Sequence, residues 1–227
     1  MDYKVVEVKE NLLIENENRA KELREKLTKK GIFFINLMAS PGSGKTTLLV
    51  NLINRIKNEY SIGVMEADID GDVDADRIHK LTGVPSIQVH TSGACHLTAQ
   101  MVEDAIDSFE IKDINLLILE NVGNLVCPAE FDTGAHLNLV LLSVPEGDDK
   151  PLKYPLMFEV ADMVAITKLD TLPVFTFNID KCKENIHLRN KDIDIYPISA
   201  LEDQGVDELV KALKAKINHK INKKASL

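Results

Sequence analysis

The chain has 227 residues, enough for one α/β domain with a short appended element. Apolar residues make up 44% and charged residues 28%, so the chain can bury a core and lacks the composition of a disordered protein. Its net charge of −9 disfavours binding to nucleic acid or to an anionic membrane surface, because like charges repel. No signal peptide opens the chain and no apolar run reaches the roughly 18 residues of a membrane span, so we expect a cytoplasmic protein.

Apolar runs alternate with amphipathic stretches along most of the chain. Residues 8–30 carry Leu and Ala at helical spacing before Gly31, which predicts an N-terminal helical extension over residues 1–30. The alternation that follows predicts an α/β fold, a mainly parallel sheet with helices on both faces, over residues 31–220, and then a polar tail over residues 221–227. Strands are expected at residues 32–38, 61–67, 86–90, 114–120, 137–144, 163–167 and 194–197, and helices at residues 46–58, 74–81, 97–109 and 206–218.

Residues 39–46, ASPGSGKT, follow a predicted strand and begin a predicted helix. They match the phosphate-loop pattern G-x-x-x-x-G-K-[ST], except that Ala39 replaces the first glycine. Small residues let backbone N–H groups surround a β-phosphate at the positive end of a helix, while the lysine reaches the β- and γ-phosphates and the hydroxyl binds Mg²⁺. An ordinary glycine-rich turn would not require Gly-Lys-Thr. We therefore predict a P-loop nucleotide-binding fold, with the phosphates bound by Pro41, Gly42, Ser43, Gly44, Lys45, Thr46 and Thr47.

Two acidic residues, Asp68 and Glu120, lie at or just beyond the ends of predicted strands. The carboxyl ends of parallel strands meet at the ligand-binding edge of such a sheet, so either acid can hold Mg²⁺ or orient an attacking water. The alternative is that each acid only marks the point where its strand reaches solvent. We expect a magnesium site of Thr46, Asp68 and Glu120, and catalytic roles for Lys45, Asp68 and Glu120.

The string Thr167-Lys168-Leu169-Asp170 ends another predicted strand, far downstream of the phosphate loop. GTPases carry [N/T]-K-x-D at this place, because the aspartate accepts hydrogen bonds from the N1–H and N2–H₂ of guanine, a donor pair that adenine lacks. The stem of the lysine can stack on the base, and the later Ser-Ala pair lies where such proteins present a backbone N–H to guanine O6. The sequence therefore predicts GTP rather than ATP, bound through Thr167, Lys168, Asp170, Ser199 and Ala200.

Cys95 and His96 are adjacent, and Cys127 follows the strand that ends at Glu120. Thiolate and imidazole suit Zn²⁺ or Ni²⁺, and both segments are expected in loops near the nucleotide end of the sheet. Three ligands leave the fourth position of a tetrahedral site to water or to a second subunit. The alternative is a pair of buried cysteines beside an unrelated histidine. Cys182, in a predicted helix, is interpreted as structural, and all three thiols are expected to be reduced.

Three longer strings in the sequence indicate a resemblance to a known family. They are residues 93–97 (GACHL), 120–128 (ENVGNLVCP) and 146–155 (EGDDKPLKYP), together with the phosphate loop. With them the chain resembles the HypB family, GTPases of nickel insertion into hydrogenases and relatives of the urease nickel-insertion GTPase. The resemblance implies a SIMIBI-class P-loop fold and a GTP-dependent homodimer with metal bound through Cys95, His96 and Cys127 at or near the dimer interface. It also implies a HypA-like nickel metallochaperone and a hydrogenase large-subunit precursor as partners.

The chain departs from the family pattern in two respects. Many members carry a cysteine-rich nickel motif or a histidine-rich stretch at the N-terminus, and neither occurs before Ala39, so high-affinity N-terminal nickel binding is not expected. Thr167 replaces the usual asparagine, which is expected to loosen the loop that holds the base.

Together these patterns predict a metal-regulated GTPase that hydrolyses GTP to GDP and phosphate and assists nickel insertion into a hydrogenase precursor. Lys153 is assigned to the nucleotide-binding set as a residue that contacts the site across the dimer interface. Three alternatives remain open. They are a non-catalytic metal carrier in which GTP only sets the dimer state, an ATP-dependent kinase or partition-type ATPase, and nickel delivery to urease.

Overall fold

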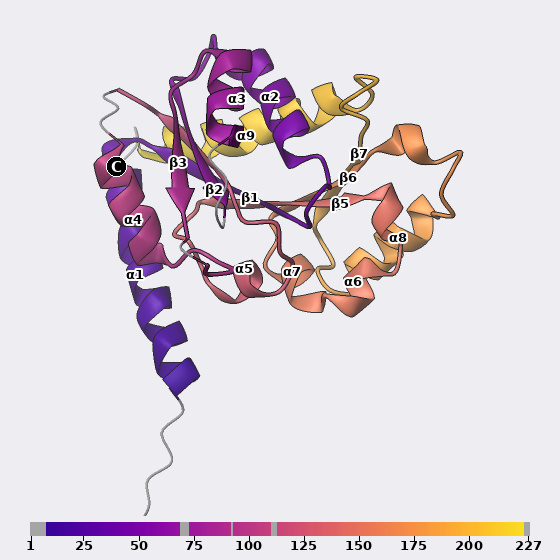
Figure 1. Ribbon diagram of the computed structural model, residues 1–227, viewed down its shortest axis with the longest axis horizontal. Helices are drawn as coiled ribbons and strands as arrows, with labels where there is room; N and C mark the ends of the chain where they lie inside the picture. The colour runs from indigo at the N-terminus through magenta and orange to yellow at the C-terminus, as the bar shows by residue number, and fades with distance from the viewer. Residues whose placement is uncertain (1–7, 69–72, 92, 110–112, 225–227) are drawn as a thin grey trace, which may run out of the picture.

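Seven strands form one parallel sheet in the order β3-β2-β4-β1-β5-β6-β7 (Figure 1). The computed structural model describes residues 8–68, 73–91, 93–109 and 113–224. The strands are β1 (Phe33–Ala39), β2 (Ile62–Asp68), β3 (Ser86–His90), β4 (Leu116–Glu120), β5 (Leu137–Ser143), β6 (Met163–Thr167) and β7 (Asp194–Pro197). The predicted α/β class with a mainly parallel sheet is confirmed.

The central strands are buried on both faces, which explains why they read as continuous apolar runs rather than alternating ones. All seven residues of β1 and all five of β4 and β6 are buried. The edge strands β3 and β7 are only partly buried, and they are correspondingly less apolar.

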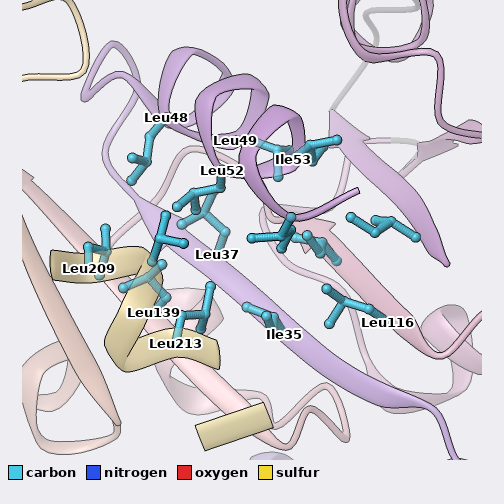
Figure 2. Close-up of a cluster of buried hydrophobic side chains, with 14 of the residues drawn as sticks. Ile35, Leu37, Leu48, Leu49, Leu52, Ile53, Leu116, Leu139, Leu209 and Leu213 are labelled. Atoms are coloured by element: carbon cyan, nitrogen blue, oxygen red, sulfur yellow. The ribbon is translucent and has the colours of Figure 1, made fainter. Parts of the chain in front are cut away.

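Helices cover both faces of the sheet (Figure 1). Leucines and isoleucines of α2 (Lys45–Ile56) and α9 (Val206–Lys224) pack on β1, β4 and β5, as Figure 2 shows, and α3 (Val73–Thr82) joins this layer. The opposite face is covered by α1 (Val8–Lys30) and α4 (Ala99–Ser108) over β1, β2 and β4, and by three further helices over β5 and β6. These three are α5 (Cys127–Glu130), α7 (Pro155–Glu159) and α8 (Ile179–His187).

The N-terminal helix α1 is an integral part of the domain. Ala20, Leu23 and Leu27 are almost completely buried, and Leu23 and Leu27 pack with Phe34 and Leu117 of the sheet. Gly31 ends the helix with a positive φ of 79°, a conformation that favours glycine. The predicted extension is therefore a docked helix.

Three asparagines, of which Asn36 and Asn121 are buried and Asn138 is partly buried, form a ladder across the sheet beneath the loop that follows β4. Asn121 donates from Nδ2 to Oδ1 of Asn36 at 3.0 Å, and Asn36 donates in turn to Oδ1 of Asn138 at 3.0 Å. Asn138 continues the chain to the carbonyl oxygen of Val160 at 3.1 Å. Since buried amides are stable only when they are paired, this ladder fixes the start of the loop after Glu120 on the sheet.

Several short elements were not predicted. Helices α5 and α6 (Lys150–Lys153) have four residues each, too few for a 3.6-residue period to be visible, and α7 has five. Two 3₁₀ turns, Val144–Glu146 and Leu169–Thr171, are equally local. Helix α9 runs to Lys224, beyond the expected end at residue 218, so the predicted start of the polar tail at residue 221 lies within a helix. No helix in the described part of the chain is both long and apolar enough to cross a membrane.

The burial of α1 leads to a stability prediction. Leu23→Ala should lower the free energy of unfolding by about 2–5 kcal/mol, because it leaves a cavity between α1 and the sheet. Leu12→Ala on the same helix, where the side chain is 53% exposed, should change it by no more than about 0.5 kcal/mol. Urea denaturation followed by circular dichroism compares them, and equal midpoints would contradict the docking of α1.

Candidate functional site

A cavity of about 490 Å³ opens at the carboxyl ends of β1, β2 and β4. It is lined by most of the predicted phosphate loop and by both predicted strand-end acids. The lining residues are Pro41, Gly42, Gly44, Lys45, Thr46, Thr47, Glu66, Ala67, Asp68, Glu120, Asn121, Val122, Gly123 and Lys168. Residues predicted from three distant parts of the sequence thus meet in one place.

The phosphate loop has the backbone conformation that its glycines permit. Gly42 and Gly44 have φ of 72° and 95°, in the left-handed region where a side chain would be strained. Gly44 precedes α2 and offers no side-chain cap, so the first N–H groups of that helix remain for another acceptor. Lys45 extends back over the loop, with Nζ 3.5 Å from the carbonyl oxygen of Ser40. The loop therefore presents backbone donors and a cation to the cavity.

The predicted magnesium ligands lie together. The hydroxyl of Thr46 donates to Oε1 of the buried Glu120 at 2.9 Å, and the half-buried Asp68 lines the same cavity. Hydroxyl and carboxylate oxygens are the donors that Mg²⁺ prefers, so this set fits the ion.

Glu66 is a further acid that sequence analysis missed. It is buried, lines the cavity, and lies directly opposite Glu120 in the pairing of β2 with β4. The available signal was an acid inside an apolar strand, two residues before Asp68 and therefore on the same face.

A second cavity of about 320 Å³ adjoins the phosphate loop and is lined by four of the five predicted base-binding residues, Thr167, Lys168, Asp170 and Ala200. Lys168 adopts a left-handed conformation with φ of 62° and points its stem toward Gly44, whose added Cβ would lie 3.9 Å from Cε of the lysine. Ser199 donates from its hydroxyl to Oδ1 of Asp170 at 2.6 Å, so the serine orients the carboxylate. Asn51 of α2 donates to the carbonyl oxygen of Ala200 at 3.3 Å, which ties this loop to the helix that follows the phosphate loop.

Thr167 connects the base-binding loop to the phosphate loop. Its buried hydroxyl donates to the carbonyl oxygen of Ser43 at 2.8 Å. The expectation that threonine loosens this loop is not supported by the contact, because the hydroxyl supplies a direct tether between the two loops.

The predicted metal ligands also come together. The ligand atoms of Cys95, His96 and Cys127 lie within 4.8 Å of one another. The thiol of Cys95 donates to the sulfur of Cys127 at 2.8 Å, and Nδ1 of His96 lies 3.7 Å from the sulfur of Cys95. The ring of His96 stacks on Phe131, with centroids 3.8 Å apart. Two sulfurs and an imidazole at this spacing fit Zn²⁺ or Ni²⁺.

The environment sets the protonation of these groups. The hydrogen bond to Cys127 raises the pKa of Cys95, so at neutral pH its thiol keeps the proton until a metal displaces it. Burial lowers the pKa of His96, which leaves the imidazole neutral and able to bind a cation. Burial raises the pKa of Cys182 to about 12, in agreement with a structural role in α8.

The loop between Glu120 and Cys127 touches the phosphate loop. A Cβ added to Gly123 would lie 3.0 Å from Cγ and 3.1 Å from the backbone nitrogen of Pro41. The two backbones are thus in close contact, and the metal-binding segment begins four residues further along.

Lys153 is not brought to the nucleotide cavities. It lies on α6 with its side chain 61% exposed and forms an ion pair with Asp149 at 2.6 Å. Its predicted role across a dimer interface stays a prediction.

A parallel sheet of this strand order, a phosphate loop after β1 and acids at the ends of β2 and β4 define a P-loop nucleotide-binding protein of the SIMIBI class. The structure of the signal recognition particle receptor FtsY from Elizabethkingia anophelis with GDP shares this fold, with a TM-score of 0.53 at 16% identity, over 80% of this chain and 65% of that one. The family model for the CobW/HypB/UreG nucleotide-binding domain matches residues 33–197. The chain belongs to this family, in its HypB branch.

Relatives within the HypB branch cover nearly the whole chain. The hydrogenase/urease maturation factor HypB of Helicobacter pylori is 42% identical over 209 residues, which are 90% of this chain and 85% of that protein. The hydrogenase maturation factor HypB of Escherichia coli is 42% identical over 205 residues, 90% of this chain and 70% of that protein.

Two solved HypB structures agree with the fold in detail. The crystal structure of Helicobacter pylori HypB in complex with nickel has a TM-score of 0.85 at 41% identity, covering 91% of this chain and 97% of that one. The crystal structure of HypB from Archaeoglobus fulgidus has a TM-score of 0.83 at 35% identity, covering 90% and 100%.

Proposed function

We propose that the chain hydrolyses GTP to GDP and phosphate and, as a GTP-dependent dimer, assists the insertion of Ni²⁺ into a hydrogenase precursor. The observation that carries the proposal is the position of the Cys95–His96–Cys127 cluster, whose second segment follows directly on the loop that touches Pro41 of the phosphate loop. A nickel-bound structure of a HypB that is 41% identical supports Ni²⁺ as the cargo.

The nucleotide half of the proposal assigns a role to each group in the two cavities. Lys45 neutralises charge on the β- and γ-phosphates, and Thr46, Asp68 and Glu120 hold Mg²⁺, which supplies further charge stabilisation to the phosphates when bound. Asp170, held by Ser199, accepts the two guanine donors. Such hydrolysis depends on positioning and charge stabilisation, so we expect slow turnover until a second subunit or a partner completes the site.

The metal half concerns delivery of a cargo. Three ligands from two segments leave a position for water or a partner's ligand, which suits an ion that must leave again. The partners we propose are a HypA-like metallochaperone and the large-subunit precursor of a hydrogenase. Urease is the second candidate recipient, because the Helicobacter pylori relative is a hydrogenase/urease maturation factor. Measuring the nickel content of each purified precursor after incubation with the loaded chain separates these recipients.

Asp170→Asn tests the base site. The amide cannot accept both guanine donors but can donate to the carbonyl of xanthine, so GTP affinity should fall about 10–100-fold while affinity for xanthosine triphosphate rises. Fluorescent-nucleotide displacement measures both affinities. Asp180→Asn, at an exposed position of α8, is the matched control and should bind GTP like the parent. Unchanged GTP affinity with no gain for the xanthine nucleotide would remove Asp170 from the site.

Cys127→Ala tests the metal site. It should abolish tight binding of Ni²⁺ and Zn²⁺ and leave GTP affinity unchanged in the absence of metal, whereas Cys182→Ala should keep both. Binding by the parent should release protons and weaken as pH falls, because the thiol of Cys95, whose pKa is raised, must lose its proton. Chelator competition at several pH values measures this. Parental affinity in Cys127→Ala would leave the cluster without a metal function.

The dimer has its own test. Light scattering with a non-hydrolysable GTP analogue should give a dimer, and with GDP a monomer, because a ligand shifts an equilibrium only through different contacts in the two states. Lys153→Ala should weaken the dimer, and Lys183→Ala, on α8, serves as the control. A monomer with the analogue at high protein concentration would contradict the proposal.

A further inference from the structure

Two separate segments supply the ligands of the metal cluster. Cys95 and His96 lie in the segment that enters α4 at Ala99, and Cys127 begins α5, from which the chain continues to Asp132. Neither segment is a strand of the sheet. We call these segments the Cys95–His96 arm and the Cys127 arm. The contacts that set the distance between the two arms help to determine how well their ligands can hold an ion.

The side chain of Asn16 on α1 bonds to both arms. Its Oδ1 accepts a hydrogen bond from the backbone N–H of Ala99 at 2.8 Å, and its Nδ2 donates to the backbone carbonyl oxygen of Asp132 at 2.9 Å. The partners fix the orientation of the amide, since a backbone N–H needs an acceptor and a carbonyl needs a donor. Ala99 follows His96 by three residues and Asp132 follows Cys127 by five, so one amide group spans the two arms.

The bond to Ala99 supplies a partner that the helix itself cannot provide. The N–H of Ala99 belongs to the first turn of α4, where a helix provides no carbonyl for it. Asn16 is only 7% exposed, so water cannot readily take its place.

The Cys127 arm also contacts α1 at other points. Arg24 donates from Nη2 to both carboxylate oxygens of Asp132, at 2.8 and 2.6 Å, and from Nε to the carbonyl oxygen of Ala135 at 2.6 Å. The backbone at Gly134 approaches α1 so closely that an added Cβ would lie 3.0 Å from the carbonyl oxygen of Ala20. Helix α1 therefore contacts the Cys127 arm through Arg24 and Ala20 as well as through Asn16.

We propose that Asn16 is a positioning residue for the metal site. Its amide fixes the Cys95–His96 arm against the Cys127 arm, so that the ligands are already close together before a metal arrives. The ordering of the two arms is then accomplished by folding, and little of the metal's binding free energy is spent on it. The inference rests on the proposed function in so far as the cluster binds Ni²⁺ or Zn²⁺.

Asn16→Ala removes both hydrogen bonds and should lower the affinity for Ni²⁺ and Zn²⁺ about 10–100-fold, the usual effect of losing a support behind metal ligands. Competition with a chromophoric chelator measures the affinity, and circular dichroism confirms that the variant is folded. Asn18→Ala, exposed on the same helix, is the matched control and should bind both metals like the parent.

Asn16→Asp is a second variant of nearly the same size, in case the alanine variant does not fold. It keeps an acceptor for Ala99 but places a carboxylate oxygen against the carbonyl of Asp132, so only the bond to the Cys127 arm is broken. Its metal affinity should also fall below that of the parent.

A metal-free measurement tests the same geometry. Diamide oxidises the two thiols of Cys95 and Cys127 to a disulfide, and the two hydrogens reduce its N=N bond to a hydrazine. The rate depends on how often the sulfurs meet, so it should be lower in Asn16→Ala and parental in Asn18→Ala. Cys182 is completely buried and does not compete in the folded chain.

Parental metal affinity and parental oxidation rate in the Asn16 variants would overturn the proposal. A separate result, in which Cys127→Ala binds metal like the parent, would overturn the metal part of the proposed function. The oxidation rates would then still decide whether Asn16 positions the two arms, so the two failures are distinguishable.

Discussion

The parallel pairing of β1 with β4 is the constraint on which the site depends. Leu37 lies opposite Glu120, so β1 runs two residues beyond the end of β4, and the phosphate loop that follows Ala39 lies beside the loop that leaves β4. Thr46 can then reach Glu120, and Gly123 can reach Pro41. A slip of one residue in this pairing would turn Glu120 to the other face of the sheet and separate both contacts.

The phosphate loop is the shared neighbour of the other two candidate sites. On one side, Thr167 joins it to the loop that holds Asp170, and on the other, Gly123 joins it to the segment that ends in Cys127. The first joint is a hydrogen bond from the side-chain hydroxyl of Thr167 to the backbone of Ser43, and the second is a close approach of Gly123 to Pro41; all four residues line the cavities. In the proposed function, any coupling through these joints is reciprocal by linkage: nucleotide would change the affinity for metal by the same factor by which metal changes the affinity for nucleotide.

Most of the fold and much of the candidate site could be predicted from the sequence, because the patterns that encode them are local. The apolar strands, the ASPGSGKT loop and the TKLD string each lie within a few consecutive residues. Short helices such as α5 were missed because four residues show no period.

Contacts between distant residues could not be predicted in this way. Asn16 lies in a polar stretch that resembles a solvated helix face, yet its partners are 83 and 116 residues away. Asn36, inside the apolar strand β1, finds its partner Asn121 only in the assembled sheet. Each contact depends on which strands and helices become neighbours, and that information is absent from any short window of the sequence.

In the proposed function, the close approach of Gly123 to Pro41 is the link between the metal site and the nucleotide site, and its geometry limits how this link can vary. A larger side chain at position 123 would push against the phosphate-loop backbone, so the strength of the link cannot be adjusted by residue size at the point of contact. It can be adjusted in the chain from Gly123 to Cys127, whose four residue steps span at most about 14 Å when extended. In the proposed function, residues 124–126 would therefore determine how far a movement of the Cys127 thiol is transmitted to phosphates bound at the loop.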